Sequence, residues 1–470
     1  MTSDLGACAR PRWPAIPTAE PMRAAQPSLL RVELLEGAAV RPAPPEAQAR
    51  TARDGGDGGD GRAIVRLTSH AGPIALTPDT LSRHLLFIGG TGTGKTNAMM
   101  TLVAALRAQA APEDVFVVFD TKGDYLREFY RDGDRVISNA RELGPGGVHW
   151  NVFADLLAQT DDLRGDEVLE IASTIFEEQK ESAGENLFFS LGARDVFAAV
   201  LEAMARDGAS HTNQDLRRQL EGTVQELWDL IGRYPDLLGA RHYLSGGAAN
   251  TTTARAVLAF MTQGIKAAFS GAFRLPGDFS VRQFVRAKGS HALFIEYDIA
   301  AGALLLPIYR VLLDLALKEA LSRSHTAGNV FFIMDEFSLL PQLRHVADGV
   351  NFGRGLGLKF VVGAQNVGQV YHAYGPEVGQ SILSGFGTVF AFRMTDETSR
   401  QFVRERYGAN RKMITTEHTG RAVGVERNVV AGNVIEDWDL SALTTGQAIA
   451  GLPEGDPFFF PFLPYCGRGH

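Results

Sequence analysis

The chain has 470 residues, too many for one compact domain, and 45% of them are hydrophobic, which is ordinary for a soluble globular protein. Its net charge of −8 argues against a protein coated in basic surface for nucleic-acid binding, but it allows a local basic groove on an acidic body. No apolar run is long enough to cross a membrane, and the N-terminus lacks the apolar region of a secretion signal. The cysteines Cys8 and Cys466 show no metal-binding spacing and fit a reducing, cytoplasmic setting.

The N-terminal region differs in composition from the rest of the chain. Residues 1–62 are rich in Ala, Pro, Arg and Gly and end in the run DGGDGGDGR. This composition predicts a disordered or linker region. One short, mostly apolar run inside it, Leu29–Leu35, is predicted to be a strand.

From Ala63 onward, short apolar runs alternate with helical periodicity, as in a doubly wound α/β domain. Near-continuous apolar runs are typical of parallel strands whose two faces are both covered by helices. We assign residues 63–157 and 273–464 to this domain and 465–470 to a tail. The predicted strands are Leu85–Ile88, Val115–Phe119, Ala292–Tyr297, Val330–Met334, Lys359–Gly363, Thr388–Phe392 and Gln447–Gly451, and the predicted helices include Thr96–Arg107 and Ala303–Ser322.

Residues 158–272 interrupt this alternation. They show helical periodicity without a convincing strand, and strands precede and follow them. We therefore predict an all-helical insertion inside the α/β domain, and the length of the region favours this over ordinary crossover helices. The predicted helices are Asp166–Gln179, Gly192–Ala205, Thr212–Ile231 and Thr252–Ala268.

A phosphate-binding loop follows the first predicted strand of the α/β domain. The sequence GGTGTGKT at 89–96 fits GxxxxGK[ST] between a strand and a helix. In this motif, backbone N–H groups and the helix N-terminus surround the phosphates, a lysine (Lys95) bridges the β- and γ-phosphates, and a hydroxyl (Thr96) binds Mg²⁺. We predict ATP and Mg²⁺ as cofactors, bound by Gly89, Gly90, Thr91, Gly92, Thr93, Gly94, Lys95, Thr96 and Asn97.

Two adjacent carboxylates end the apolar strand Val330–Met334. Asp335 is predicted to hold Mg²⁺ through its water shell, and Glu336 to orient or deprotonate the attacking water. The carboxyl ends of parallel strands are the usual ligand site of an α/β sheet. Together with Lys95 and Thr96, these residues predict an ATPase. The long gap between the two motifs argues against small GTPases and adenylate kinases.

With these motifs in place, the chain resembles the HerA/FtsK branch of P-loop motors and, within it, conjugative type IV coupling proteins of the TraD/TraG kind. Separate stretches over about 80–464 carry the resemblance: Arg83-His84, Phe119–Asp124, His149–Phe153, Asn186–Phe189 with Ala193-Arg194, Asp335–Phe337 with Leu340-Pro341, Gly353–Gly355, Gly363–Asn366 and the C-terminal Tyr465. Three features depart from the family pattern. Coupling proteins usually begin with transmembrane helices, Thr121 replaces a proline of the family signature, and Ala364-Gln365-Asn366 stands where the family has TQS.

The resemblance implies a RecA-like P-loop core and assigns further site residues. It makes Arg354 an arginine finger that reaches the nucleotide of a neighbouring subunit, and Gln365 a sensor of the γ-phosphate. Arg393 is a lesser arginine candidate, and Asp120, Lys122 and Asp124 are accessory candidates in the family signature after the second strand.

The same resemblance implies a function and a set of partners. Family members form hexameric rings that thread DNA of unspecified strandedness through a channel by low-specificity phosphate contacts. The segment Gly408–Arg427, with Arg411, Lys412, Arg421 and Arg427, is interpreted as a mobile DNA-facing hairpin or, equally, as a solvated surface loop. The first functional hypothesis is a cytoplasmic DNA-translocating ATPase that works with relaxosome or secretion-channel proteins and reaches the inner membrane through a partner. The alternatives are a HerA-like ATPase that works with a nuclease in DNA end-processing or phage defence, and a nucleotide-switched relay module without DNA pumping.

Overall fold

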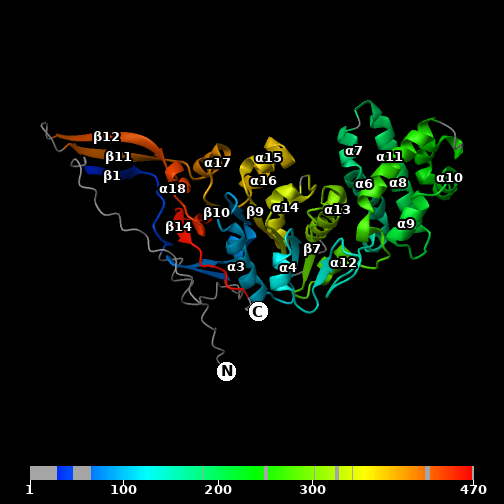
Figure 1. The fold of residues 1–470 in the computed structure, drawn as a ribbon, viewed down its shortest axis with the longest axis horizontal. Helices are drawn as coiled ribbons and strands as arrows, with labels where there is room; N and C mark the ends of the chain where they lie inside the picture. Colours follow the sequence, from blue (N-terminus) through cyan, green and yellow to red (C-terminus); the bar gives the residue numbers. More distant parts are fainter. Residues whose placement is uncertain are drawn as a thin grey trace, which may run out of the picture.

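The computed structural model describes residues 29–45, 65–182, 184–247, 252–300, 302–322, 328–340, 342–418 and 424–467. The molecule has three parts along its longest axis, which Figure 1 shows horizontally. A three-stranded sheet projects at one end, a nine-stranded sheet with its helices occupies the middle, and a group of helices forms the other end.

The central nine-stranded sheet is mostly parallel. Seven neighbouring strands pair in parallel from β10 to β6, and β13 and β14 extend the β10 side in antiparallel pairing. In spatial order the strands are β14 (Phe458–Pro461), β13 (Gln447–Gly451), β10 (Thr388–Phe392), β4 (Leu85–Ile88), β9 (Leu358–Ala364), β8 (Val330–Met334), β5 (Val115–Asp120), β7 (Ala292–Glu296) and β6 (Arg135–Ile137). The seven predicted strands are all present in this sheet, and the sequence reasoning missed β6 and β14.

Both faces of the central sheet are buried, as the continuous apolar runs predict. Alternate residues of β4 enter different cores: Leu85 and Phe87 belong to one, and Leu86 and Ile88 to the other. The first core contains α3 and the β2–β3 ribbon, whereas the second contains α13 and continues into the helical region. The elements flanking the sheet are β2 (Val65–Ser69), β3 (Gly72–Leu76), α2 (Pro78–Ser82), α3 (Lys95–Ala108), α4 (Asp124–Phe129), α5 (Val152–Leu157), α12 (Val281–Ala287), α13 (Gly302–Ala320), α14 (Val346–Phe352), α15 (Val367–Tyr374), α16 (Pro376–Ser384), α17 (Glu397–Tyr407) and α18 (Asp437–Ser441).

The described residues between 158 and 272 form helices and turns without a strand, so the predicted fold class, an α/β P-loop core with an all-helical insertion, is confirmed. The limits 158 and 272 stay a prediction. The helices are α6 (Asp161–Ile175), α7 (Glu177–Ser182), α8 (Leu187–Arg206), α9 (Asn213–Leu220), α10 (Val224–Ile231) and α11 (Thr252–Ala268), with 3₁₀-helices at Gly184–Asn186, Pro235–Gly247 and Gly271–Arg274.

One predicted helix of this region, Thr212–Ile231, is two helices. Helix α9 ends at Leu220, and α10 starts after Thr223, whose side chain accepts a hydrogen bond from the Glu226 N–H. The Glu226 carboxylate accepts in return from the Thr223 N–H, which completes a capping box. The apolar periodicity continues through the break. A prediction based on periodicity alone therefore gave one helix where the structure has two, separated by this cap.

The three-stranded sheet brings the N-terminal strand to the C-terminal part of the chain. Strand β1 (Leu29–Glu36), predicted at Leu29–Leu35, pairs in antiparallel fashion with β11 (Ala409–His418), and β11 pairs with β12 (Gly424–Asn433). Beyond β1, the Arg41 backbone exchanges hydrogen bonds with the backbone of residues 457 and 459. The rest of the predicted linker, residues 1–28 and 46–62, lies outside the described residues.

The β11–β12 hairpin bears on the two interpretations of Gly408–Arg427. The described part of this segment is a paired hairpin, not a solvated loop, because every residue of β11 has a partner in β12. Two of its predicted DNA-contacting cations are bound to acids: Arg411 to Glu36, and Lys412 to Glu436 at 2.6 Å. Arg427 lies exposed on β12, and Arg421 lies outside the described residues.

No helix in the described part of the chain has the length and apolarity needed to cross a membrane.

Candidate nucleotide-hydrolysis site

The phosphate-binding loop lies where the parallel strands end, between β4 and α3. Two of its glycines are required by close backbone approaches. At Gly89 (φ +155°) a Cβ atom would lie 2.6 Å from the Phe392 Cβ, and at Gly94 (φ +101°) it would lie 2.8 Å from the Gly446 nitrogen. The loop is therefore clamped between β10 and the segment before β13, with the N-terminus of α3 directed at it.

Lys95 and Thr96 begin helix α3 and are the reactive side chains of this loop. The Lys95 ammonium donates to the Gly89 and Gly90 carbonyl oxygens at 2.6 and 3.0 Å. Burial lowers the pKa of Lys95, and the nearby Asp335 and Glu336 carboxylates oppose this shift. A mostly buried lysine with two nearby carboxylates fits a cation that exchanges loop carbonyls for phosphate oxygens.

Asp335 forms with Thr96 the oxygen-rich pair that the sequence predicts for Mg²⁺. The Thr96 hydroxyl donates to Asp335 Oδ2 at 2.7 Å, and burial raises the pKa of Asp335. Asp335 Oδ1 is buried and has no hydrogen-bond partner among the described residues. A buried carboxylate oxygen without a partner is costly unless a cation or water satisfies it, so these residues fit a Mg²⁺ ion.

Glu336 and Gln365 meet at the ends of adjacent strands β8 and β9. The Gln365 amide nitrogen donates to both Glu336 carboxylate oxygens, at 3.2 and 3.1 Å, and its carbonyl oxygen accepts from the Thr91 hydroxyl at 3.3 Å. Lys122 Nζ lies 4.0 Å from Glu336 Oε1. Gln365 thus links the phosphate-binding loop to the predicted catalytic acid, and its role as a γ-phosphate sensor stays a prediction.

Arg354 lies on the opposite edge of the sheet. It precedes β9, whereas Gln365 follows it, and β9 runs parallel to β4. Its guanidinium is half exposed and pairs with Asp79 on α2, which precedes β4. A seven-residue strand spans roughly 20 Å, so Arg354 cannot reach the phosphate-binding loop of its own chain. The role of Arg354 as a finger that acts on a neighbouring subunit stays a prediction.

The accessory candidates after β5 occupy different positions. The Asp120 carboxylate accepts from the backbone N–H groups of residues 122, 123 and 126, at 2.8 to 3.2 Å, so it shapes the turn that presents Lys122. Asp124 begins α4 and pairs with Arg127. Lys122 is thus the accessory residue that the structure brings to Glu336.

Two further predicted residues make contacts other than the expected ones. The Arg393 carbonyl oxygen accepts from the Gly90 N–H at 2.9 Å, and its exposed side chain follows the end of β10. The Asn97 amide, predicted to bind nucleotide, is engaged on both sides by the C-terminal segment. It donates to the Leu463 carbonyl oxygen at 3.1 Å and accepts from the Tyr465 N–H at 2.6 Å. Asn97 therefore holds the C-terminal segment over the start of α3.

Sequence reasoning missed the residues that support the loop from β13. The Gly446 N–H donates to the Thr93 carbonyl oxygen at 2.8 Å, and the Thr445 hydroxyl donates to the Gly92 carbonyl oxygen at 3.2 Å. Because β13 is antiparallel to β10, its first residues lie at the edge where the parallel strands end. A TTG triplet before a strand carries no recognisable motif, so only the topology reveals this contact.

Comparison with known proteins finds a family model that matches the chain. A family model described as the type IV secretion-system coupling protein DNA-binding domain matches residues 68–434. The resemblance inferred from separate stretches of the sequence is thus confirmed. No curated protein matches the chain.

Solved structures with a similar fold include three of one coupling protein. The bacterial conjugative coupling protein TrwBdeltaN70, unbound, is 20% identical over 93% of this chain and 94% of its own, with a TM-score of 0.70. The plasmid coupling protein TrwB in complex with ADP and Mg²⁺ is 19% identical over 93% and 95%, with a TM-score of 0.69. TrwB in complex with the ATP analogue ADPNP is 20% identical over 95% and 98%, with a TM-score of 0.69.

Proposed function

The chain belongs to the family of type IV secretion-system coupling proteins, and we propose that it is an ATP-hydrolysing motor that translocates DNA. The observation that carries this proposal is the distribution of its site between two edges of one sheet. The phosphate-binding loop, Asp335, Glu336 and Gln365 lie together where the parallel strands end, and Arg354 lies at the other edge.

The proposed chemistry assigns one task to each group at the nucleotide edge. The backbone N–H groups of the loop and the Lys95 ammonium hold the phosphates of ATP. Thr96 and Asp335 would hold Mg²⁺, which neutralises charge on the phosphate oxygens when bound. Glu336 accepts a proton from the attacking water, and Gln365 positions Glu336 relative to the γ-phosphate. The nucleotide-bound TrwB structures support the choice of ATP and Mg²⁺.

We propose a ring, of hexameric size as the family resemblance suggests. Arg354 cannot reach the nucleotide site of its own chain, and it is half exposed where an adjacent copy could receive it. An arginine supplied in trans contributes about 10³–10⁵ in rate to phosphoryl transfer. Because each site would be completed by its neighbour, hydrolysis could proceed around the ring and drive a strand through its centre.

The cargo and the location follow from the family rather than from the hydrolysis site. A pump that accepts any sequence contacts mainly phosphates. We place the motor on the cytoplasmic side of the inner membrane, bound to the secretion channel through a partner. The family match favours this function over a nuclease-partnered ATPase or a relay module.

The test is steady-state ATP hydrolysis by the full chain, with and without single- and double-stranded DNA, at two salt concentrations. DNA should stimulate hydrolysis, and the stimulation should fall as salt rises because phosphate contacts release counterions. The Lys95→Ala variant should hydrolyse at the background rate with either DNA. Lys95-dependent hydrolysis that ignores DNA at both salt concentrations would contradict DNA translocation and favour the relay module.

A further inference from the structure

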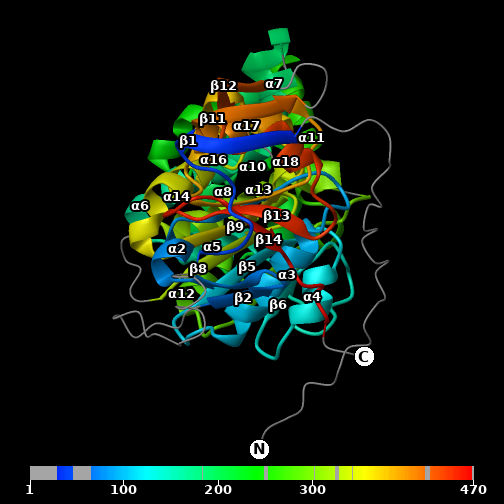
Figure 2. The same cartoon turned by 90° about the vertical axis from the view of Figure 1, so that its left-hand side faces the viewer.

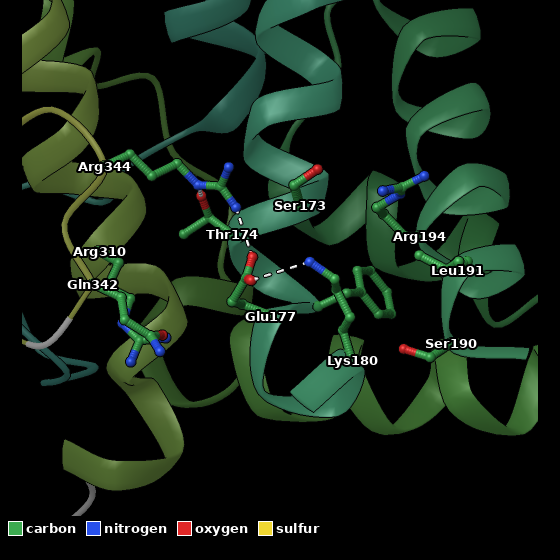
Figure 3. Close-up of a pocket in the computed structure, with 11 residues that line it drawn as sticks. Ser173, Thr174, Glu177, Lys180, Ser190, Leu191, Arg194, Arg310, Gln342 and Arg344 are labelled. Carbon is green, nitrogen blue, oxygen red and sulfur yellow. Dashed lines mark hydrogen bonds and ion pairs between the residues drawn. The ribbon is translucent and has the colours of Figure 1, made fainter. Parts of the chain in front are cut away.

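A cavity of about 420 Å³ lies between the helical insertion and the motor core, away from the nucleotide site. Figure 3 shows its lining, with Lys180, Ser190 and Arg194 on one side and Arg310, Gln342 and Arg344 on the other. The first group comes from α7 and α8 of the insertion. The second comes from α13 and from the segment that follows Asp335 and Glu336 in the chain.

The charges of this cavity differ from those of the whole molecule. The chain has a net charge of −8, yet the lining holds four cations, Lys180, Arg194, Arg310 and Arg344, and one carboxylate, Glu177. A second carboxylate, Asp195, pairs with Arg194 at 2.7 Å beside the lining. The cations therefore outnumber the acids even when Asp195 is counted. A cavity of this kind favours an anion.

Glu177 occupies the position that an incoming anion would take. Its carboxylate pairs with Lys180 at 3.5 Å and with Arg344 at 2.7 Å, as the dashed lines in Figure 3 show. The Arg344 guanidinium also donates to the Thr174 hydroxyl at 3.1 Å. Glu177 thus bridges a cation of the insertion and a cation of the motor. A backbone phosphodiester carries the same single negative charge as this carboxylate and offers two non-bridging oxygens to the same pair of cations.

Independent observations on the walls point to a missing ligand. Ser190 is 1% exposed, lines the cavity, and its hydroxyl has no hydrogen-bond partner among the described residues. A buried hydroxyl without a partner is costly, and a phosphate oxygen would accept from it. Gln342 lies in the left-handed region (φ 64°), where a residue other than glycine is strained, and strain of this kind gathers at ligand sites.

We infer that this cavity is a phosphate-binding pocket in which the insertion and the motor together hold a backbone phosphate of the DNA. The shared chemistry is a phosphate group held by Lys180, Arg194, Arg344 and the Ser190 hydroxyl, with Arg310 as a buried cation behind them. The choice of DNA as the source rests on the proposed function, and the pocket lies within the matched family region. Free phosphate is the other source of the same group.

The test uses the full chain carrying Lys95→Ala, so that the nucleotide site contributes little phosphate binding. The pocket variant is the double substitution Lys180→Gln with Arg194→Gln. The matched control is Arg218→Gln with Arg233→Gln, which removes the same charge from exposed positions of the insertion. Binding of a fluorescein-labelled single-stranded oligodeoxynucleotide is measured by anisotropy over a range of salt, and binding of inorganic phosphate is measured by calorimetry.

The pocket variant should bind the oligodeoxynucleotide about tenfold more weakly than the control, because charged hydrogen bonds to phosphate are lost. Its salt dependence should fall by about 0.7 in slope for the phosphate contact removed. Glu177→Gln should bind more tightly than the parent, since it removes the carboxylate that competes with phosphate. This opposite effect cannot come from misfolding.

The remaining outcomes are equally decisive. If the pocket variant weakens only inorganic phosphate binding, the pocket takes a free phosphate and the DNA assignment is wrong. If neither ligand distinguishes the pocket variant from the control, or if Glu177→Gln binds no more tightly than the parent, the inference is overturned. DNA-independent ATP hydrolysis, measured with Lys95 restored, should be unchanged by the pocket substitutions, which separates failure of this pocket from failure of the motor.

Discussion

The two edges of the parallel sheet differ in what they contain and in how complete they are. At the edge where the strands end, four strands bring together the phosphate-binding loop, Asp335, Glu336, Gln365 and Lys122. Hydrogen bonds of 2.7 to 3.3 Å connect several of these side chains. At the opposite edge, Arg354 is half exposed and contacts the surface residue Asp79.

The side chains of the nucleotide edge are assembled within one chain. The Arg354 edge, in contrast, offers a cation for which we propose a partner site on an adjacent copy. At the nucleotide edge, one chain supplies all the side chains that we propose to bind ATP and to position the attacking water. The Arg354 edge offers a cation whose pairing with Asp79 is exposed and therefore easily exchanged, because exposed ion pairs contribute about 0–1 kcal/mol. An ATPase with this layout is expected to depend on contact between copies, and each prediction below tests that dependence or its limits.

The largest effect is expected from Arg354→Ala. Hydrolysis should fall by about 10³-fold or more, while ATP binding stays near the parent value, because a finger in trans stabilises charge in the transition state. Steady-state hydrolysis and nucleotide binding measure the two parts. Asp79→Asn, which breaks the same ion pair and leaves the arginine, should hydrolyse at close to the parent rate.

Mixing variants sharpens this test. An inactive Lys95→Ala chain still presents Arg354, and an inactive Arg354→Ala chain still has its phosphate-binding loop. Together they should regain measurable hydrolysis at their shared boundaries. A mixture that stays as inactive as its components, in assemblies shown to contain both chains, would place Arg354 outside the neighbour's site.

The next effect is that of Glu336→Gln. Hydrolysis should fall by about 10²–10⁴-fold because the amide cannot accept the proton of water, and ATP should stay bound. Trapped nucleotide measured after gel filtration checks this expectation. Glu296→Gln, which changes an acid at the end of β7, two strands away from β8, should change the rate little. Normal turnover by Glu336→Gln would remove Glu336 from the role of general base.

Gln365→Ala should have a smaller effect, a loss of about tenfold in rate, because Glu336 and Thr91 would lose the side chain that connects them. Pre-steady-state measurement should assign the loss to the hydrolysis step and not to ATP binding. Gln369→Ala, on the adjoining helix α15, is the matched control and should leave the rate unchanged. Equal losses in both variants would show a general disturbance of this edge.

The smallest effect is expected away from both edges, where His345 bonds to Glu170 between the motor and the insertion. The hydrogen bond to Glu170 raises the pKa of His345, so the stability from this pair is present below the unfolded value of 6.5 and is lost as pH rises through the raised pKa. His345→Gln should lower the melting temperature by about 2 °C at about pH 5.5 and by less at about pH 9. Melting curves of both proteins at the two pH values check this. A deficit that grows with pH would contradict the assigned sign.

The sequence by itself determined the features whose chemistry is local. The loop at 89–96 and the acids at 335 and 336 follow strands that are recognisable as apolar runs, and parallel strands bring such ends to one edge. The seven strands predicted from those runs are all present, because burial on both faces leaves an unbroken apolar pattern. The sequence pattern was less informative at Thr223, where a capping box separates two helices although the apolar helical periodicity continues across them.

Only the tertiary structure decided features that depend on residues far apart in the chain. It placed Thr445 and Gly446 beneath the phosphate-binding loop, and it turned the Asn97 amide towards the C-terminal segment. It also paired Leu29–Glu36 with β11, and it set Arg354 at the edge opposite Lys95. Each of these depends on strand order and direction, which are set by the packing of the whole sheet. A local motif records the chemistry of its own residues but not which distant segment will lie beside them.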